Sequence, residues 1–161
     1  MNRWLGLLLG LGLFSGAWAA EPTNRLSFPK AGFSIQPLEA AVSKTPQMVL
    51  TMSLPLQDGF AGNVNVLIQT YTNSLSEYIT LSEAQFKAAG ISLLKTTRPT
   101  DSVAVLEYFG KLQNRVLHWY ARAELVNQRL YLVTATTSED RWTEESAILK
   151  GCVDSFQRAG K

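Results

Sequence analysis

The stretch RVLHWYARAELVNQRLYLVTATT, residues 115–137, decides the fold because polar and apolar side chains alternate along most of its length. Alternation with a period of two predicts β-strands, here over residues 115–125 and 129–137. Asn127 and Gln128 stand between the two runs as a two-residue turn, although Gln is a poor second residue for a tight primed turn. The stretch therefore predicts an antiparallel hairpin.

This hairpin assigns its side chains to two faces of a sheet. A turn at Asn127 and Gln128 pairs Leu125 with Leu130, and alternation places successive side chains on opposite faces. One face is apolar and predicts core: Leu117, Trp119, Ala121, Ala123, Leu125, Leu130 and Leu132. The other is mixed: His118, Tyr120, Arg122, Glu124, Tyr131, Val133 and Ala135. Such a face is either packed under the N-terminal arm or residues 38–46, or it is a binding surface.

Two segments change to helical spacing. Residues 74–89 carry apolar side chains at intervals of three and four, with Ser74 or Ser76 as an N-cap and Gly90 after the end. Residues 143–158 repeat this pattern. Their sheet-facing side chains are expected to be Leu149, Cys152, Val153 and Phe156, with Trp142 at the start.

The remaining alternating runs are shorter. They predict strands over residues 33–35, 48–54, 63–71, 91–97 and 102–109, after an extended arm at 20–31. The order is therefore strands, helix, four strands, helix. Because four strands follow one another without a helix between them, the order predicts an antiparallel sheet with helices packed on it, an α+β fold.

The N-terminus has the features of a secretory signal peptide. Arg3 precedes an uncharged apolar run over residues 4–14, and Ala17-Trp18-Ala19 supplies small residues at a cleavage site. The run is about half of the ~20 residues that a spanning helix needs. We therefore expect a signal peptide at residues 1–19, one domain at 20–161, a periplasmic location and no stable membrane span after cleavage.

Charge and cysteine content narrow the function. Without residues 1–19 the chain keeps 14 basic and 13 acidic residues, and this near balance argues against nucleic acid as the partner. Cys152 is the single cysteine, so no internal disulfide forms, and its place on an apolar helical stripe predicts a buried small hydrophobe.

No catalytic constellation stands out. His118 is the sole histidine, and no Gly-x-Ser-x-Gly motif occurs. A zinc site needs several His or Cys ligands, and the chain has one of each. We therefore expect neither catalysis, nor a metal, nor a cofactor.

The sequence resembles the PsbP-like superfamily and, within it, the bacterial DcrB-like periplasmic proteins. The features that carry the resemblance follow one another in the expected order: FPKAGFSI at 28–35, NVNV at 63–66, SLSEY at 74–78, YLVTAT at 131–136 and SF at 155–156. Leu38 departs from the family pattern, in which an aromatic residue commonly follows the proline at this point. The resemblance implies about six antiparallel strands between helices, an α/β/α sandwich. It implies a scaffold that binds other proteins rather than a reaction, because members include photosystem accessory proteins, a nuclear-transport factor and secretion chaperones.

Two functions are compatible with these features. The first is a non-catalytic accessory or chaperone-like protein that binds an envelope protein or peptide through His118, Tyr120, Arg122 and Tyr131, since Tyr and Arg are favoured at protein contacts. The second is a carrier that holds a small apolar or lipidic ligand between sheet and helix. A large internal cavity would favour the carrier, whereas a filled core would favour the protein-binding function.

Overall fold

A computed structural model describes residues 25–38 and 41–158. The signal peptide predicted at residues 1–19 lies outside this range. The chain divides into two compact units, one up to Ala40 and one from Ala41 onward, which we call the main unit. The prediction of a single domain over residues 20–161 stays a prediction.

The first unit is a small antiparallel hairpin. Its strands are β1, Leu26–Phe28, and β2, Phe33–Ile35, joined by a 3-10 turn over Pro29–Ala31. Gly32 closes the turn with a φ of 75°, a left-handed conformation that favours glycine. The strand predicted at residues 33–35 is confirmed. The extended arm predicted at 20–31 is wrong over β1, which pairs with β2 in a sheet of its own.

The main unit is built on a six-stranded antiparallel sheet with the order β3-β4-β8-β7-β6-β5. Its strands are β3 (Gln47–Ser53), β4 (Asn63–Thr70), β5 (Ser92–Thr100), β6 (Val103–Leu112), β7 (Arg115–Val126) and β8 (Arg129–Ser138). The predicted α+β fold with about six strands is therefore confirmed. β5 extends beyond its predicted end through Pro99, which is tolerated because β5 is an edge strand.

The predicted hairpin has the predicted register. Leu125 pairs with Leu130, and Ala123 pairs with Leu132. The turn between them holds Asn127 at a φ of 49° and Gln128 at 59°. Both values lie in the left-handed region that a tight primed turn requires, so Gln128 adopts a conformation that is uncommon for its residue type.

Two helices complete the main unit. α1, Leu75–Ala88, begins with a capping box in which Ser74 and Glu77 bond to each other's backbone N–H groups. α2, Trp142–Asp154, follows a 3-10 turn at Glu139–Arg141. α2 ends at Asp154, four residues before the predicted end at residue 158.

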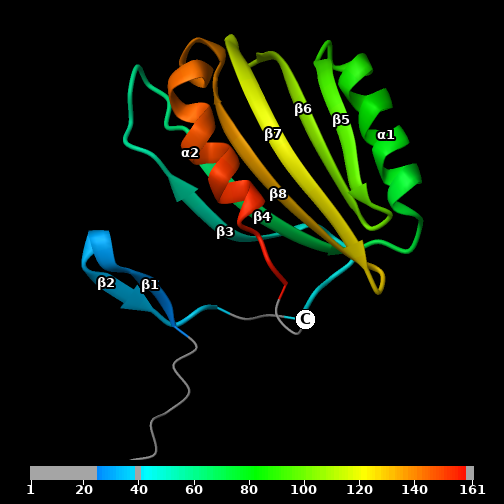
Figure 1. Cartoon of the computed structure of the whole chain (residues 1–161), viewed down its shortest axis with the longest axis horizontal. Coiled ribbons are helices and arrows are strands. Elements are labelled where there is room, and N and C mark those ends of the chain that lie inside the picture. Colours follow the sequence, from blue (N-terminus) through cyan, green and yellow to red (C-terminus); the bar gives the residue numbers. More distant parts are fainter. Residues whose placement is uncertain (1–24, 39–40, 159–161) are drawn as a thin grey trace, which may run out of the picture. The chain divides into compact units, whose positions relative to one another are not determined.

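The helices cover opposite faces of the sheet. α1 packs Leu75 and Ile79 against a cluster that includes Ala123 and Leu130. α2 packs Leu149 and Val153 against a cluster that includes Val133. Because Leu130 and Val133 are an odd number of residues apart in β8, their side chains lie on opposite faces. The predicted α/β/α layering is confirmed, and Figure 1 shows α2 over β8 and β4, with α1 beside β5.

Both layers between helix and sheet are filled. The α1 layer holds buried Leu75, Ile79, Leu106 and Leu130, with partly buried Phe86 and Tyr108 packed beside them. Cys152 is half-buried in the α2 layer, and burial raises the pKa of its thiol. In the part of the chain that the structure describes, no helix combines the length and apolar character needed to span a bilayer.

Candidate functional site

The mixed face predicted from the sequence lies under α2, which divides its polar side chains into two groups. We call Glu107, His118, Glu139, Trp142 and Lys150 the His118 cluster. We call Arg122, Glu124 and Arg158 the Arg122 cluster. His118 and Arg122 are four residues apart on β7, so alternation places their side chains on the same face of the sheet.

The His118 cluster surrounds a buried imidazole. His118 Nδ1 lies 2.6 Å from Glu139 Oε2, and His118 Nε2 lies 3.2 Å from Glu107 Oε1. The indole of Trp142 stacks on the imidazole with ring centroids 3.7 Å apart. His118 is only 3% exposed. With a carboxylate at each ring nitrogen, the imidazole offers no free nitrogen to a substrate.

Lys150 joins this cluster from α2, beside an open pocket of about 180 Å³ that Glu107, Tyr120 and Lys150 help to line. Its Nζ donates to Glu107 Oε1 at 2.9 Å and lies over the rings of Tyr120 and Trp142, 5.0 and 5.1 Å from their centroids. Burial acts to raise the pKa of Glu107, but the hydrogen bonds and charges of Lys150 and His118 outweigh it and hold that pKa below its ordinary value. The cluster is thus a paired polar network that fixes α2 to β6 and β7.

Tyr120 joins the sheet to the C-terminal end of α2. Its hydroxyl donates to Asp154 Oδ1 at 3.0 Å. Burial, together with the hydrogen bond to the Asp154 carboxylate and its charge, raises the pKa of Tyr120 to about 12. Tyr120 therefore acts as a tether for the last turn of α2.

The Arg122 cluster is built around one buried carboxylate. Arg122 Nη2 lies 3.0 Å from Glu124 Oε2, and Arg158 Nε lies 2.5 Å from Glu124 Oε1. The Glu124 side chain is 7% exposed. Burial acts to raise the pKa of Glu124, but Arg158 and Arg122 outweigh it and lower that pKa. One acid therefore serves two guanidinium groups.

Two open pockets border this cluster and share Arg158. One, of about 280 Å³, is lined by Arg122, Glu124, Phe156, Gln157 and Arg158. The other, of about 200 Å³, is lined by Val126, Asn127, Arg129, Tyr131 and Arg158. Tyr131 and Phe156 contact each other with ring centroids 5.7 Å apart. The two pockets together present three arginines, one glutamate and an aromatic pair.

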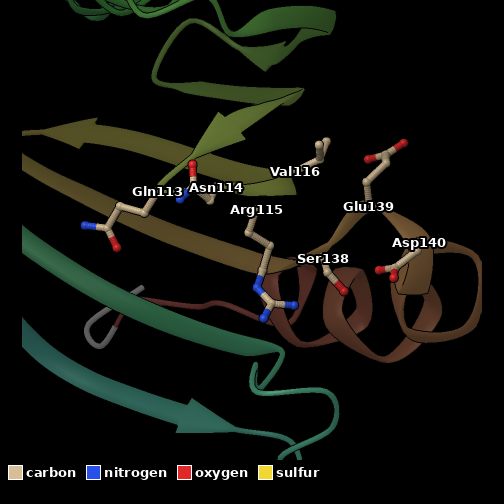
Figure 2. Close-up of a pocket in the computed structure, with 7 residues that line it drawn as sticks. All are labelled: Gln113, Asn114, Arg115, Val116, Ser138, Glu139 and Asp140. Carbon is tan, nitrogen blue, oxygen red and sulfur yellow. The ribbon is translucent and has the colours of Figure 1, made fainter.

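A larger pocket of about 700 Å³ lies at the other end of the sheet. Figure 2 shows Gln113 and Asn114 on one side of it, Ser138, Glu139 and Asp140 on the other, and Arg115 between them. Arg115 already donates to the Asp58 carbonyl oxygen at 2.9 Å and lies over the Phe60 ring. Its one cation, Arg115, is already engaged, and its two acids, Glu139 and Asp140, carry the charge opposite to that of Arg115. We therefore assign no ligand class to this pocket.

The four binding residues predicted from the sequence do not form one exposed patch. His118 is buried in the His118 cluster, and Tyr120 is bonded to α2. Arg122 and Tyr131 border the two pockets around Arg158. α2 covers part of this face, and cover of the rest by the N-terminal arm or residues 38–46 stays a prediction. Whether the four residues bind a partner stays a prediction.

Several members of these clusters were not recognised from the sequence. Glu107 and Glu139 reach His118 from two different elements, and Lys150 reaches Glu107 from α2. Arg158 reaches Glu124 from beyond α2. One signal was available, since Lys150 follows Leu149 on the helix face assigned to the sheet. Across residues 25–38 and 41–158, no group of three His, Cys, Asp or Glu side chains converges to hold a metal ion.

The comparisons with known proteins agree with this architecture. The sequence model of the PsbP family matches residues 68–158, more than half of the chain. The chain belongs to the PsbP family. The match runs from β4 to the segment after α2, so it includes both helices and both polar clusters. No curated protein matches the chain.

Two solved structures are similar to this PsbP family member. PA94 from Pseudomonas aeruginosa, a protein of unknown function, has a TM-score of 0.61 at 12% identity, covering 85% of this chain and 97% of that one. The solution structure of cyanobacterial PsbP from Synechocystis has a TM-score of 0.47 at 16% identity, covering 83% of this chain and 90% of that one. At 12% identity, the similarity to PA94 concerns the fold alone.

Proposed function

We propose that this protein is a non-catalytic accessory or chaperone-like protein of the bacterial envelope that binds a partner protein or peptide. The observation that carries the proposal is the Arg122 cluster, where arginines and an aromatic pair border two open pockets. Arg and Tyr are enriched among the residues that dominate protein contacts, because they combine contact area with hydrogen bonding. Membership in the PsbP family, whose members are generally non-catalytic, supports the same function.

The absence of a catalytic role for His118 is part of this proposal. Any general acid or base in the chain that relied on imidazole would have to use His118, the sole histidine. Both of its ring nitrogens are within hydrogen-bond distance of carboxylates, and Trp142 covers one ring face. A general base needs a nitrogen within reach of the substrate proton, so His118 is better suited to holding α2 in place.

The periplasmic location and the DcrB-like assignment are further parts of the proposal. They are supported by the residues at the N-terminus, where Arg3, an apolar run and Ala17-Trp18-Ala19 have the order of a signal peptide. N-terminal sequencing of the protein recovered from a periplasmic extract tests this directly. We expect the mature chain to begin at Ala20, and recovery of the intact chain from the cytoplasmic fraction alone would contradict it.

The alternative function, a carrier of a small apolar ligand, has less support. Such a ligand would lie between sheet and helix, where the α1 layer holds Leu75, Ile79, Leu106 and Leu130 with 0–4% exposure. A carrier would need to displace this packing, and opening a cavity among such side chains costs several kcal/mol. The filled layer favours the protein-binding function.

Site-specific photocrosslinking in envelope extracts tests the proposed function. A photoreactive amino acid at exposed Gln157, beside the Arg122 cluster, should capture a reproducible protein partner. The matched control is the same group at exposed Leu81 on α1, which lies on the other face of the sheet. Equal capture at both positions, or none at Gln157, would contradict the proposal. A co-purifying lipid would favour the carrier instead.

Tyr120 and Arg122 are poor choices for a binding test in this protein. Tyr120 holds the end of α2 through Asp154, and Arg122 neutralises buried Glu124. Truncation of either side chain removes a structural bond, so loss of binding would not separate contact from stability. Arg129 is the better position, because it lines a pocket and is exposed.

A further inference from the structure

The Arg122 cluster has more positive charge than its own acid can neutralise. Glu124 receives Arg122 at one carboxylate oxygen and Arg158 at the other. Arg129 lines the neighbouring pocket, and among residues 25–38 and 41–158 no acidic side chain forms an ion pair with it. Three guanidinium groups therefore face one carboxylate, which leaves an excess of two positive charges around the shared pockets.

The geometry of this excess selects the chemistry of the ligand. Glu124 is bonded to Nη2 of Arg122 and to Nε of Arg158, which uses one donor nitrogen of each guanidinium. An arginine presents five N–H donors in a planar fork that matches carboxylates and phosphates. Because buried Glu124 holds the fork of Arg158 in a fixed position, the remaining donors of Arg158 are ordered before a ligand arrives, which reduces the entropy cost of binding.

The size of the pockets limits what enters them. At about 280 and 200 Å³, each is smaller than the roughly 300–1,000 Å³ of sites that enclose a whole small molecule. They fit single side chains that project from a larger partner. Tyr131 lines one of these pockets and Phe156 the other, and the two rings offer apolar surface to a neighbouring side chain.

We propose that the Arg122 cluster binds an acidic peptide segment of the partner protein, with a carboxylate held by Arg158 and Arg129 and an apolar or aromatic neighbour packed on Tyr131 and Phe156. This inference rests on the proposed function, since it names the chemistry of the partner at the same surface. Charge complementarity is the argument for a carboxylate. The aromatic pair is the argument for a peptide rather than a free anion.

Fluorescence anisotropy with a defined probe tests the inference. The probe is a short labelled peptide of alternating Glu and Tyr, and its control has Gln in place of every Glu. We expect the Glu peptide to bind and the Gln peptide to bind at least tenfold more weakly, because a charge-assisted bidentate pair is worth about 1.5–3 kcal/mol. Equal binding of both peptides would overturn the inference.

Three variants locate the probe on the surface. Arg129→Gln should weaken binding about tenfold. Arg98→Gln removes the same charge from exposed β5 and should leave binding unchanged. Arg158→Lys keeps the charge but loses the fork, so we expect intermediate affinity. If Arg98→Gln weakens binding as much as Arg129→Gln, the probe responds to net charge alone and the inference is wrong.

Competition distinguishes carboxylate from phosphate. At matched ionic strength, inorganic phosphate and acetate should displace the Glu peptide equally poorly, because neither contacts the aromatic pair. Displacement by phosphate at much lower concentration than by acetate would overturn the carboxylate assignment. The proposed function is judged separately: capture of a protein at Gln157 without binding of the Glu peptide rejects only the inference, whereas absence of capture rejects the proposed function.

Discussion

The two polar clusters under α2 share one sheet face and differ in how their charges are balanced. In the His118 cluster, a carboxylate lies beside each nitrogen of a ring that is 3% exposed, and Lys150 pairs with one of these two carboxylates. In the Arg122 cluster, two guanidinium groups share a single buried carboxylate beside open pockets. The difference indicates that the first cluster holds the helix on the sheet, whereas the second has charge left for a ligand.

Removing the imidazole should have the largest effect on stability. His118→Ala leaves Glu139 without its partner, removes one of the two partners of Glu107, and leaves a gap beneath Trp142. Hydrogen bonds to charged groups contribute about 1.5–3 kcal/mol each, and Lys150 still neutralises Glu107, so we expect a loss of about 3 kcal/mol. Urea unfolding followed by Trp fluorescence measures this loss.

His118→Phe provides the matched control, because it retains the stack on Trp142 and loses both hydrogen bonds. Its stability should lie between those of the wild type and His118→Ala. If His118→Ala costs less than about 1 kcal/mol, a value within the range of ordinary substitutions, the cluster does not fix α2 and the comparison fails.

Acid should weaken both clusters. The pKa values of Glu107 and Glu124 are lower in the folded chain than in the unfolded one. The unfolded chain therefore binds more protons as the pH falls, and the stability from these groups, complete above about pH 4.3, is lost as the pH drops through the folded pKa values. Unfolding curves between neutral and strongly acidic pH measure the loss.

Two variants assign this acid sensitivity to its source. Glu107→Gln should remove the part that belongs to the His118 cluster, and Glu124→Gln the part that belongs to the Arg122 cluster. Each variant should be less stable at neutral pH and should lose less stability on acidification. A pH profile that remains parallel to the wild type in both variants would show that other carboxyls control acid unfolding.

The hydrogen bond between Tyr120 and Asp154 should contribute less to the free energy of unfolding than the His118 cluster does. Tyr120→Phe removes the hydrogen bond to Asp154 and keeps the ring, so we expect a loss of about 1 kcal/mol. The raised pKa of Tyr120, about 12, predicts that this stability is present below the ordinary Tyr pKa of about 10 and declines as the pH rises toward 12. Asp154→Asn serves as the partner control. An alkaline titration in which this tyrosine ionises with the exposed ones would contradict the prediction.

The smallest effect on stability is expected at Arg129. Its side chain is exposed, and Arg129→Gln should change the free energy of unfolding by less than about 0.5 kcal/mol. A thermal melt measures this change. If the melting temperature falls strongly, Arg129 belongs to a structural network. The region around the Arg122 cluster would then have no free positive charge to set it apart from the His118 cluster.

Much of this fold could be predicted because its information is local. The alternation in residues 115–137 predicted the register of β7 and β8. Ser74 or Ser76 at the start and Gly90 at the end predicted the bounds of α1, and Ser74 is its N-cap. The sheet-facing side of α2 was also predicted correctly, since Leu149 and Val153 are buried against the sheet. Local periodicity decides these features, and tertiary packing agrees with it.

The contents of the candidate site could not be predicted in the same way. The sequence identified a mixed face with His118, Arg122 and Glu124, but both partners of His118 and the second partner of Glu124 come from other elements. Glu107 lies on β6, and Arg158 lies beyond the end of α2. The register of β6 and β7 brings Glu107 to His118. The position of Arg158 depends on how α2 docks, which is set by packing over the whole face rather than by any spacing in the chain. For this reason, the sequence did not show that the mixed face contains two separate clusters, the His118 cluster and the Arg122 cluster.

The strand order has a consequence for a chain that is synthesised from its N-terminus. β3 pairs with β4, and β5, β6 and β7 pair in succession, but only β8 joins these two parts, because it lies between β4 and β7. Loop closure between distant segments is slow compared with hairpin formation. Until residues 129–138 have emerged, the strands of the main unit therefore form two separate sheets with four exposed edges, and pairing of β8 reduces these to the two edges of the finished sheet.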